Sequence, residues 1–128
     1  MKMNMLSLRL RNGAIGASKD TISVEASWDV SSARQFARAI TRMAQRRPSH
    51  VIIDMSKTRT VDSFGFGSLV AGLKKLGESG ATPLVVCSNP TVRRLMDFAR
   101  IARTITMFDR VSDARRALIE RTADAPAS

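Results

Sequence analysis

The stretch from His50 to Gly67, HVIIDMSKTRTVDSFGFG, decides the fold class. It begins with a short apolar run from His50 to Met55, which is typical of a strand buried on both faces. A polar loop is expected from Ser56 to Thr60, and Asp62-Ser63 then precede apolar residues at helical spacing. A buried strand that leads through a loop into a helix is the building unit of an α/β protein with parallel strands.

The residues after this stretch predict one long helix. Gly77 and Gly80 mark its end, because glycine is favoured where a helix terminates. The spacing of its apolar residues predicts a single buried stripe. This stripe is expected to comprise Phe66, Leu69, Val70, Leu73 and Leu76.

Strands and helices continue to alternate beyond this helix. The run from Thr82 to Cys87 predicts a second buried strand. Asn89-Pro90 is a helix start, with Asn as the cap and Pro in the first helical position. A short strand is expected at Thr104–Phe108, and a last helix after Asp109.

Upstream of His50 the pattern predicts two strands. Apolar and polar residues nearly alternate from Met3 to Leu10 and again from Thr21 to Ser27, which indicates strands with one buried face. Asn12-Gly13 is a turn signal, and a loose stretch follows it as far as Asp20. These segments predict an antiparallel strand pair at one edge of the sheet.

The segment between Val30 and Pro48 predicts a helix with a basic face. Apolar residues recur at helical spacing from Ala33 to Ala44, and either Asp29 or Ser31 is able to cap its start. Four arginines follow one another at intervals of four residues and form a stripe on the polar face: Arg34, Arg38, Arg42 and Arg46. The stripe indicates a solvated helix face or contacts with an acidic protein; contacts with DNA or lipid are disfavoured because no aromatic residues interleave the arginines and no nucleic-acid-binding motif is present.

The whole pattern predicts an α/β fold: a mixed, mostly parallel sheet of four to five strands with about four helices. We expect a single domain over residues 1–121 and a flexible C-terminal tail over 122–128. The chain has 128 residues and a net charge of +10. Such a charge permits contact with nucleic acid, anionic lipid or an acidic protein and does not choose between them, while no apolar run is long enough to span a membrane.

Few residues offer chemistry of their own. The single cysteine, Cys87, lies in an apolar run, and the single histidine, His50, has no serine and aspartate at a spacing that suggests a catalytic triad. One Cys and one His also argue against a metal site, and we expect no cofactor. Trp28 is either a residue at the rim of the core or an anchor for a partner.

The start of the second helix offers the clearest functional signal. A serine at position 63 is able to cap the helix, and loss of such a cap costs about 0.5 to 2 kcal/mol. The same helix terminus favours a phosphate on that hydroxyl. Gly65 and Gly67 would leave the first turn open to the close approach of a partner.

In these motifs the sequence resembles the STAS domain, the fold of anti-sigma factor antagonists and of sulphate-transporter tails. The Asp-Ser-(Ser/Thr)-Gly motif of the family matches Asp62–Gly65, and its strand-ending Asp matches Asp54. Phe64 stands where the family usually has a small hydroxyl residue, and Ala26 stands where it usually has glycine. Further matches are Gly80, the Gly-x-x-Asp motif at Ala26–Asp29, and Pro90–Leu95.

The resemblance implies a regulatory binding module rather than an enzyme. In antagonists of this family a partner anti-sigma factor kinase phosphorylates the serine matched by Ser63, phosphate blocks binding, and a phosphatase reverses it. It implies a bacterial, cytoplasmic protein that neither binds nucleic acid directly nor inserts into a membrane. The residues expected to bind the partner are Asp29, Asp54, Asp62, Phe64, Gly65 and Gly67, with electrostatic help from the arginine stripe.

One alternative stays within the family. The chain would then be a constitutive STAS-type adaptor subunit of a larger complex, such as a lipid-transport ABC system, and Ser63 would be only a helix cap. An acidic Mg²⁺ cluster of Asp29, Asp54 and Asp62, as in phosphoaspartate receivers, is disfavoured because the paired acids and the lysine of such domains are missing.

Overall fold

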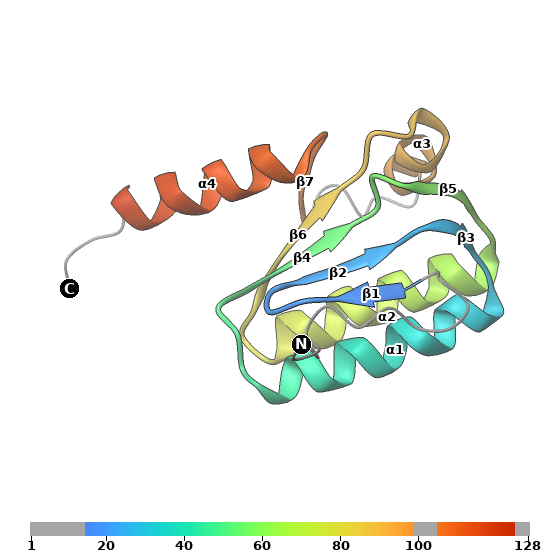
Figure 1. The fold of residues 1–128 in the computed structure, drawn as a ribbon, viewed down its shortest axis with the longest axis horizontal. Helices are drawn as coiled ribbons and strands as arrows, with labels where there is room; N and C mark the ends of the chain where they lie inside the picture. Colours follow the sequence, from blue (N-terminus) through green and yellow to red (C-terminus); the bar gives the residue numbers. More distant parts are fainter. Residues whose placement is uncertain (1–14, 99–104, 125–128) are drawn as a thin grey trace, which may run out of the picture.

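The computed structural model describes residues 15–98 and 105–124 and has the predicted α/β architecture (Figure 1). The predicted strand at Met3–Leu10 lies outside the described residues. The elements are β1 (Ile15–Ala17), β2 (Thr21–Val24), β3 (Ala26–Trp28), α1 (Val30–Gln45), β4 (His50–Asp54), β5 (Thr58–Val61), α2 (Ser63–Glu78), β6 (Thr82–Val86), α3 (Pro90–Phe98), β7 (Thr106–Phe108) and α4 (Val111–Asp124).

The main sheet is mixed and mostly parallel, as predicted. Its five strands stand in the order β1-β2-β4-β6-β7. β1 pairs antiparallel with β2, and the remaining neighbours are parallel. A separate parallel pair, β3 and β5, lies beyond the carboxyl ends of β2 and β4 (Figure 1). In this small second sheet, β3 leads directly into α1 and β5 leads directly into α2.

The strand pairs differ from the prediction in two places. The antiparallel partner of β2 is Ile15–Ala17, a segment whose sequence predicts a loose stretch. The predicted polar loop contains β5: Thr58 is buried and its Oγ1 donates to the carbonyl of Val24 at 2.6 Å, whereas Arg59 and Thr60 are exposed. Because one face of this short strand pair is exposed to solvent, the sequence of β5 is polar and resembles that of a loop.

The single predicted strand at Thr21–Ser27 is in fact two strands that belong to different sheets. The chain turns between them at Ala26, whose φ of 61° lies in the left-handed region. A side chain disfavours that region because Cβ crowds the following carbonyl, at a cost of about 1 to 2 kcal/mol. Ala26 therefore holds a turn that glycine would form without strain.

We expect Ala26→Gly to raise the free energy of unfolding by about 0.5 kcal/mol. The relief of left-handed strain exceeds the added chain entropy of glycine in the unfolded state. Ala37→Gly, at an exposed position of α1, is the control and should lower stability by about 1 kcal/mol. Urea unfolding of both variants measures the difference, and equal losses would contradict the argument.

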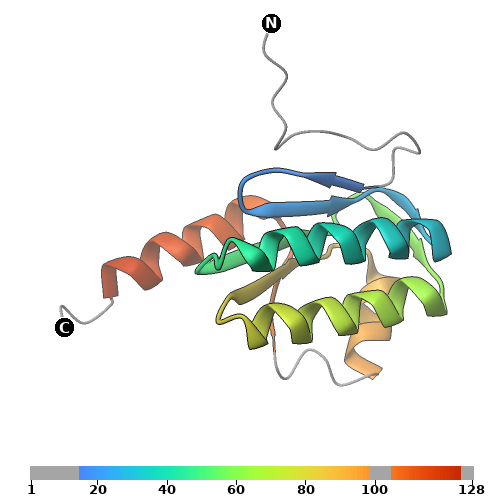
Figure 2. The ribbon, with the colours of Figure 1, turned by 90° about the horizontal axis from the view of Figure 1, so that it is seen from below.

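The core has two parts, one on each face of the main sheet. Figure 2 looks onto the face with α1 and α2 in front of the strands. Helices α1 and α2 cover one face and α4 lies on the other. Val51 and Ile53 of β4 face the first pair, and Ile52, between them, faces α4. On α2, Leu69, Leu73 and Leu76 are buried as predicted, but Val70 is 41% exposed because it lies beside the buried stripe.

The helix ends follow the predicted chemistry. The side chain of Asn89 accepts from the N–H groups of Thr91 and Val92, so it caps α3. Gly80, with φ of +93°, follows the end of α2. Helix α4 continues to Asp124, and the boundary at residue 121 stays a prediction. None of the helices within the described ranges is long and apolar enough to cross a membrane.

A polar cluster around Asp20 links the amino ends of β2 and β4 to the last helix. Arg115 of α4 donates to both carboxylate oxygens of Asp20, at 3.0 and 3.1 Å. His50 Nε2 lies 2.9 Å from the same carboxylate. The hydrogen bonds from Arg115 hold the pKa of Asp20 well below its usual value, against the opposing effect of burial.

This depressed pKa predicts acid sensitivity. A carboxyl group whose folded pKa lies below its unfolded value of about 4 adds stability above that pH, and the contribution disappears as the pH falls further. Asp20→Asn should cost about 1 kcal/mol at pH 7, since Arg115 is half exposed and solvent screens the pair. Unfolding measured from pH 7 to pH 3 should show the difference from wild type shrinking below pH 4; a constant difference would contradict the assignment.

Candidate phosphoacceptor loop

The starts of α1 and α2 are brought together by the small sheet. Trp28 of β3 pairs with Val61 of β5, and the N–H of Asp62 donates to the carbonyl of Trp28 at 3.1 Å. Asp29 and Asp62 follow these paired residues, and each caps the helix that begins next. The two helix N-termini therefore lie at the same end of the molecule (Figure 1).

Asp62, and not Ser63, caps α2. Its Oδ1 accepts from the N–H of Gly65 at 2.9 Å, while Ser63 is the exposed first residue of the helix. The expectation that Ser63 caps the helix is wrong, because the side chain one residue earlier already occupies the position from which a cap reaches the third helical N–H. Among the described residues, nothing accepts from or donates to the Ser63 hydroxyl.

The local electrostatics favour an anion beside this hydroxyl. The N–H groups of Ser63 and Phe64 have no acceptor within the described parts of the chain, since the first turn of a helix lacks intrahelical partners. These groups and the helix dipole are attractive to negative charge. The single carboxylate of Asp62 offsets part of this field.

Gly65 is required by the packing of Trp28. A Cβ at residue 65 would lie 2.4 Å from the carbonyl oxygen of Trp28 and 2.6 Å from its ring. Trp28 is only 1% exposed, its Nε1 donates to Ser68 at 2.9 Å, and its ring packs against Phe36. Trp28 is therefore a core residue, which excludes the partner-anchor alternative.

Phe64 projects away from this core. Its side chain is 62% exposed, as expected from a position about 200° around the helix from Phe66. A Cβ at Gly67 would meet nothing within 4 Å, so packing does not require glycine at this position, as it does at Gly65. Val30, at the first position of α1, is 45% exposed. Each of the two helix starts thus presents an apolar side chain to solvent, and that of α2 is adjacent to Ser63 in the sequence.

The remaining aspartates of the predicted set serve local structure. Asp29 Oδ1 accepts from the N–H groups of Ser31 and Ser32, both at 3.1 Å. Asp54, half-buried at the end of β4, accepts from the N–H of Ser56 at 2.9 Å. Across residues 15–98 and 105–124, no three His, Cys, Asp or Glu side chains are grouped so as to hold a metal ion.

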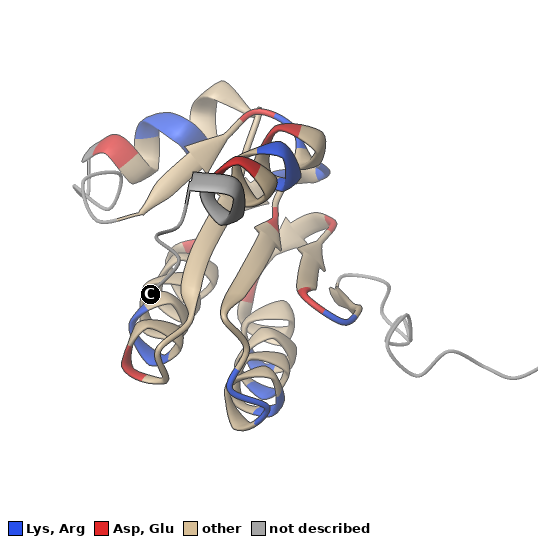
Figure 3. Cartoon of the chain, turned by 90° about the vertical axis from the view of Figure 1, so that its left-hand side faces the viewer, with Lys and Arg blue, Asp and Glu red and all other residues tan. Residues whose placement is uncertain are grey.

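The arginine stripe of α1 is shorter than predicted. Arg34, Arg38 and Arg42 are exposed along the helix, but Arg46 lies past its end and donates to the carbonyl of Lys19 at 2.8 Å. The helix contains no Asp or Glu. In Figure 3 its C-terminal end is coloured blue for Lys and Arg and has no red for Asp or Glu. A hollow of about 330 Å³ runs beside Arg38 and Arg42.

His50 and Cys87 are explained by the fold. The ring of His50 links Asp20 to Ser49, whose Oγ lies 3.2 Å from Nδ1. Sequence spacing missed this chain of contacts because Asp20 is thirty residues away. Arg115 engages both oxygens of Asp20, so we assign the cluster a structural role. Cys87 is buried, and burial raises the pKa of its thiol, which leaves it a poor nucleophile.

Comparison with known proteins identifies the family and the fold. A protein of Thermotoga maritima named as an anti-sigma factor antagonist is 28% identical over 64 residues, which span 50% of this chain and 57% of the relative. The chain thus matches little more than half the length of that relative.

Two solved structures share the fold. An anti-sigma factor antagonist from Mycobacterium paratuberculosis superimposes with a TM-score of 0.70 at 23% identity, covering 86% of this chain and 97% of the other. A sulfate transporter family protein from Wolinella succinogenes gives a TM-score of 0.68 at 12% identity, covering 79% and 87%. The STAS domain model matches residues 18–114, and the chain therefore belongs to the STAS domain family.

Proposed function

We propose that the protein is an anti-sigma factor antagonist whose binding is switched by phosphorylation of Ser63. In the unphosphorylated form it binds an anti-sigma factor serine kinase and so releases a sigma factor. Phosphate on Ser63 ends the binding, and a phosphatase restores it. The observation that carries the proposal is the exposed Ser63 hydroxyl, which stands in an Asp-Ser-x-Gly motif and is not needed as a cap.

The transfer requires nothing catalytic from this chain. The Ser63 oxygen attacks the γ-phosphorus of ATP held by the kinase, ADP leaves, and a base of the kinase takes the hydroxyl proton. The protein is accordingly proposed as a binding module that acts in the cytoplasm without direct nucleic-acid contact or membrane insertion. The similar proteins from Thermotoga and Mycobacterium are named as anti-sigma factor antagonists, which supports the proposed antagonist function.

The proposed partner surface surrounds Ser63. Phe64 supplies an exposed ring, and Gly67 leaves space beside it. Asp29 and Asp62 are exposed at the two helix starts. Asp54 and Gly65 are less accessible and would contribute by shaping the loop.

The basic face of α1 is proposed to guide an acidic partner to this surface. Arg34, Arg38 and Arg42 lie on the helix whose start adjoins α2, and Lys75 of α2 donates to Thr41 beside them. Charges of one sign accelerate association with an oppositely charged protein and make the rate salt-dependent.

The test of the proposed function is phosphate mapping. Each histidine-kinase-like serine kinase encoded by the source genome is purified and incubated with the protein and ATP, and the product is analysed by mass spectrometry. The expected result is one kinase that places a single phosphate on Ser63. Phosphate on Ser56 or Ser88, or on no residue with any of the kinases, would overturn the switch and favour the constitutive adaptor.

Phe64→Ala should weaken binding to that kinase about tenfold or more while moving the melting temperature by less than about 2 °C. An exposed aromatic ring is a hot-spot candidate, and its removal leaves no cavity. Calorimetric titration and thermal unfolding measure the two effects. Val70→Ala, another exposed apolar side chain on the same helix, is the matched control. A large loss of melting temperature with unchanged affinity would assign the ring to the core.

A further inference from the structure

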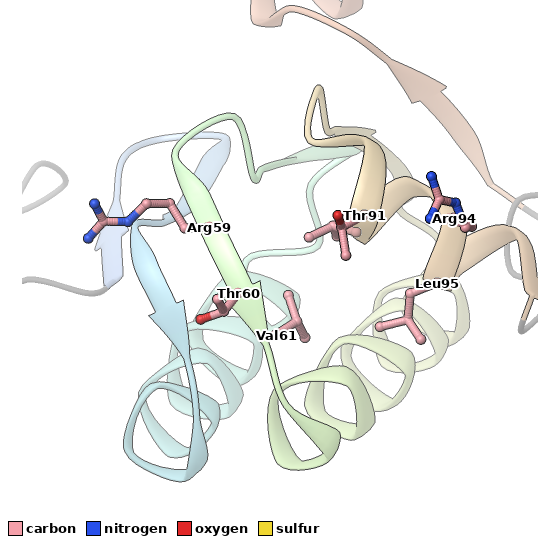
Figure 4. A pocket seen from close by; sticks show the side chains of 7 residues that line it. Arg59, Thr60, Val61, Thr91, Arg94 and Leu95 are labelled. Carbon is pink, nitrogen blue, oxygen red and sulfur yellow. The ribbon is translucent and has the colours of Figure 1, made fainter.

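A pocket of about 550 Å³ lies between β5 and α3, next to the chain that leads to Ser63. Val61 contributes from the strand, and Val92 and Leu95 contribute from the helix. Figure 4 shows the side chains of Val61 and Leu95 pointing into the space between the two elements. Most of the lining surface is apolar, and the volume of the pocket falls in the range of ligand-binding sites.

The walls of this pocket are fixed to each other. The side-chain nitrogen of Asn89 donates to the carbonyl of Arg59 at 3.2 Å, and its oxygen accepts from the N–H of Thr91 at 2.9 Å. One side chain therefore joins the strand to the capped start of the helix. A shape that is set before binding reduces the entropy lost when a ligand enters.

The rim of the pocket is basic. Arg59 and Arg94 are exposed lining residues on opposite sides of it, and in Figure 4 the Arg59 side chain extends outward from β5. Neither forms an ion pair with a described residue, whereas the neighbouring Arg93 pairs with Asp109. No Asp or Glu is among the described lining residues. The ligand that complements this site is apolar at its centre and negatively charged on both sides.

We infer that this pocket receives an apolar side chain carried on an acidic segment of the anti-sigma factor. The inference rests on the proposed function and adds a second contact to the surface around Ser63. Continuity favours it, because Val61 in the pocket wall is only two residues from Ser63. The pocket would select the partner by shape and charge, while Ser63 determines whether binding occurs.

The first arm of the test needs no kinase. The ¹⁵N-labelled protein is titrated with three capped peptides: Glu-Asp-Leu-Asp-Glu, the same peptide with a central serine, and Lys-Arg-Leu-Arg-Lys. The expected result is that only the first peptide shifts the amide signals of Val61, Thr91 and Leu95. Shifts confined to α1, equal shifts with all three peptides, or no shifts would overturn the inference.

The second arm uses the kinase that phosphorylates Ser63. Thr91→Trp, which fills the pocket from an exposed position, and the double variant R59E/R94E should each weaken its binding at least tenfold. K74E/R116E makes the same change in net charge at exposed positions elsewhere and should alter affinity less than threefold. If the pocket variants bind as tightly as wild type while Ser63→Glu does not, the inference fails and the proposed function stands. If no kinase acts on Ser63, the proposed function fails and the peptides alone decide whether the pocket takes such a segment.

Discussion

Gly65→Ala is expected to destabilise the protein by about 3 kcal/mol, which for a domain of this size lowers the melting temperature by roughly 10 °C. The added Cβ would lie 2.4 Å from the carbonyl oxygen of Trp28, a backbone atom that has no rotamer by which to move away. The start of α2 would have to lift off β3. The Nε1 hydrogen bond of Trp28 to Ser68 would be strained with it.

Gly67→Ala is the matched control for this experiment. The position lies two residues further along the same helix, and its added Cβ meets no atom within 4 Å. Because alanine is a better helix former than glycine, this variant should gain about 0.5 to 1 kcal/mol. Chemical unfolding of both variants gives the comparison. Similar effects of the two substitutions would show that Trp28 does not restrict the helix start.

Ser63→Glu is expected to lower affinity for the partner kinase about thirtyfold or more. An unpaired charge enclosed in an interface costs about 2 kcal/mol or more, and each 1.4 kcal/mol changes affinity tenfold. Ser63→Ala should bind within about threefold of wild type, since binding needs the loop uncharged. Calorimetric titration of the three proteins measures these affinities, and equal binding by all three would favour a constitutive adaptor.

Measurements of stability distinguish a loss of affinity from a loss of folded protein. Because Asp62 caps α2, Ser63→Ala should change the free energy of unfolding by less than about 0.5 kcal/mol. Asp62→Ala, which removes the actual cap, should cost about 1 kcal/mol. The reverse order of the two losses would restore Ser63 as the cap.

The regular parts of the fold were predictable from periodicity and capping chemistry. The apolar spacing identified α1 and α2, and Asn89-Pro90 identified the start of α3 because a cap followed by proline fixes a helix start from local residues alone. The buried strands β4 and β6 also stand out as apolar runs. Each of these signals is local in sequence.

The missed features depend on contacts between distant residues. β5 is hard to recognise because Thr58 is its one fully buried residue, Arg59 and Thr60 are exposed, and its partner strand is some thirty residues away. The burial of Trp28 follows from the absence of a side chain at Gly65, which no pattern around Trp28 reveals. The cap at Asp62 had a local signal, namely an aspartate three residues before the N–H of Gly65, and the serine beside it obscured that signal.

The order of the main sheet bears on how the protein is made. From β1 through β2, β4 and β6 to β7, each strand of this sheet lies beside the one synthesised before it. As the chain leaves the ribosome, every new strand therefore meets an edge that already exists, and no gap must wait for a later segment. The contact between Asp20 and Arg115 joins residues 95 positions apart and closes only when α4 has emerged. Assembly of the sheet can thus proceed during translation, with this ion pair as a late step.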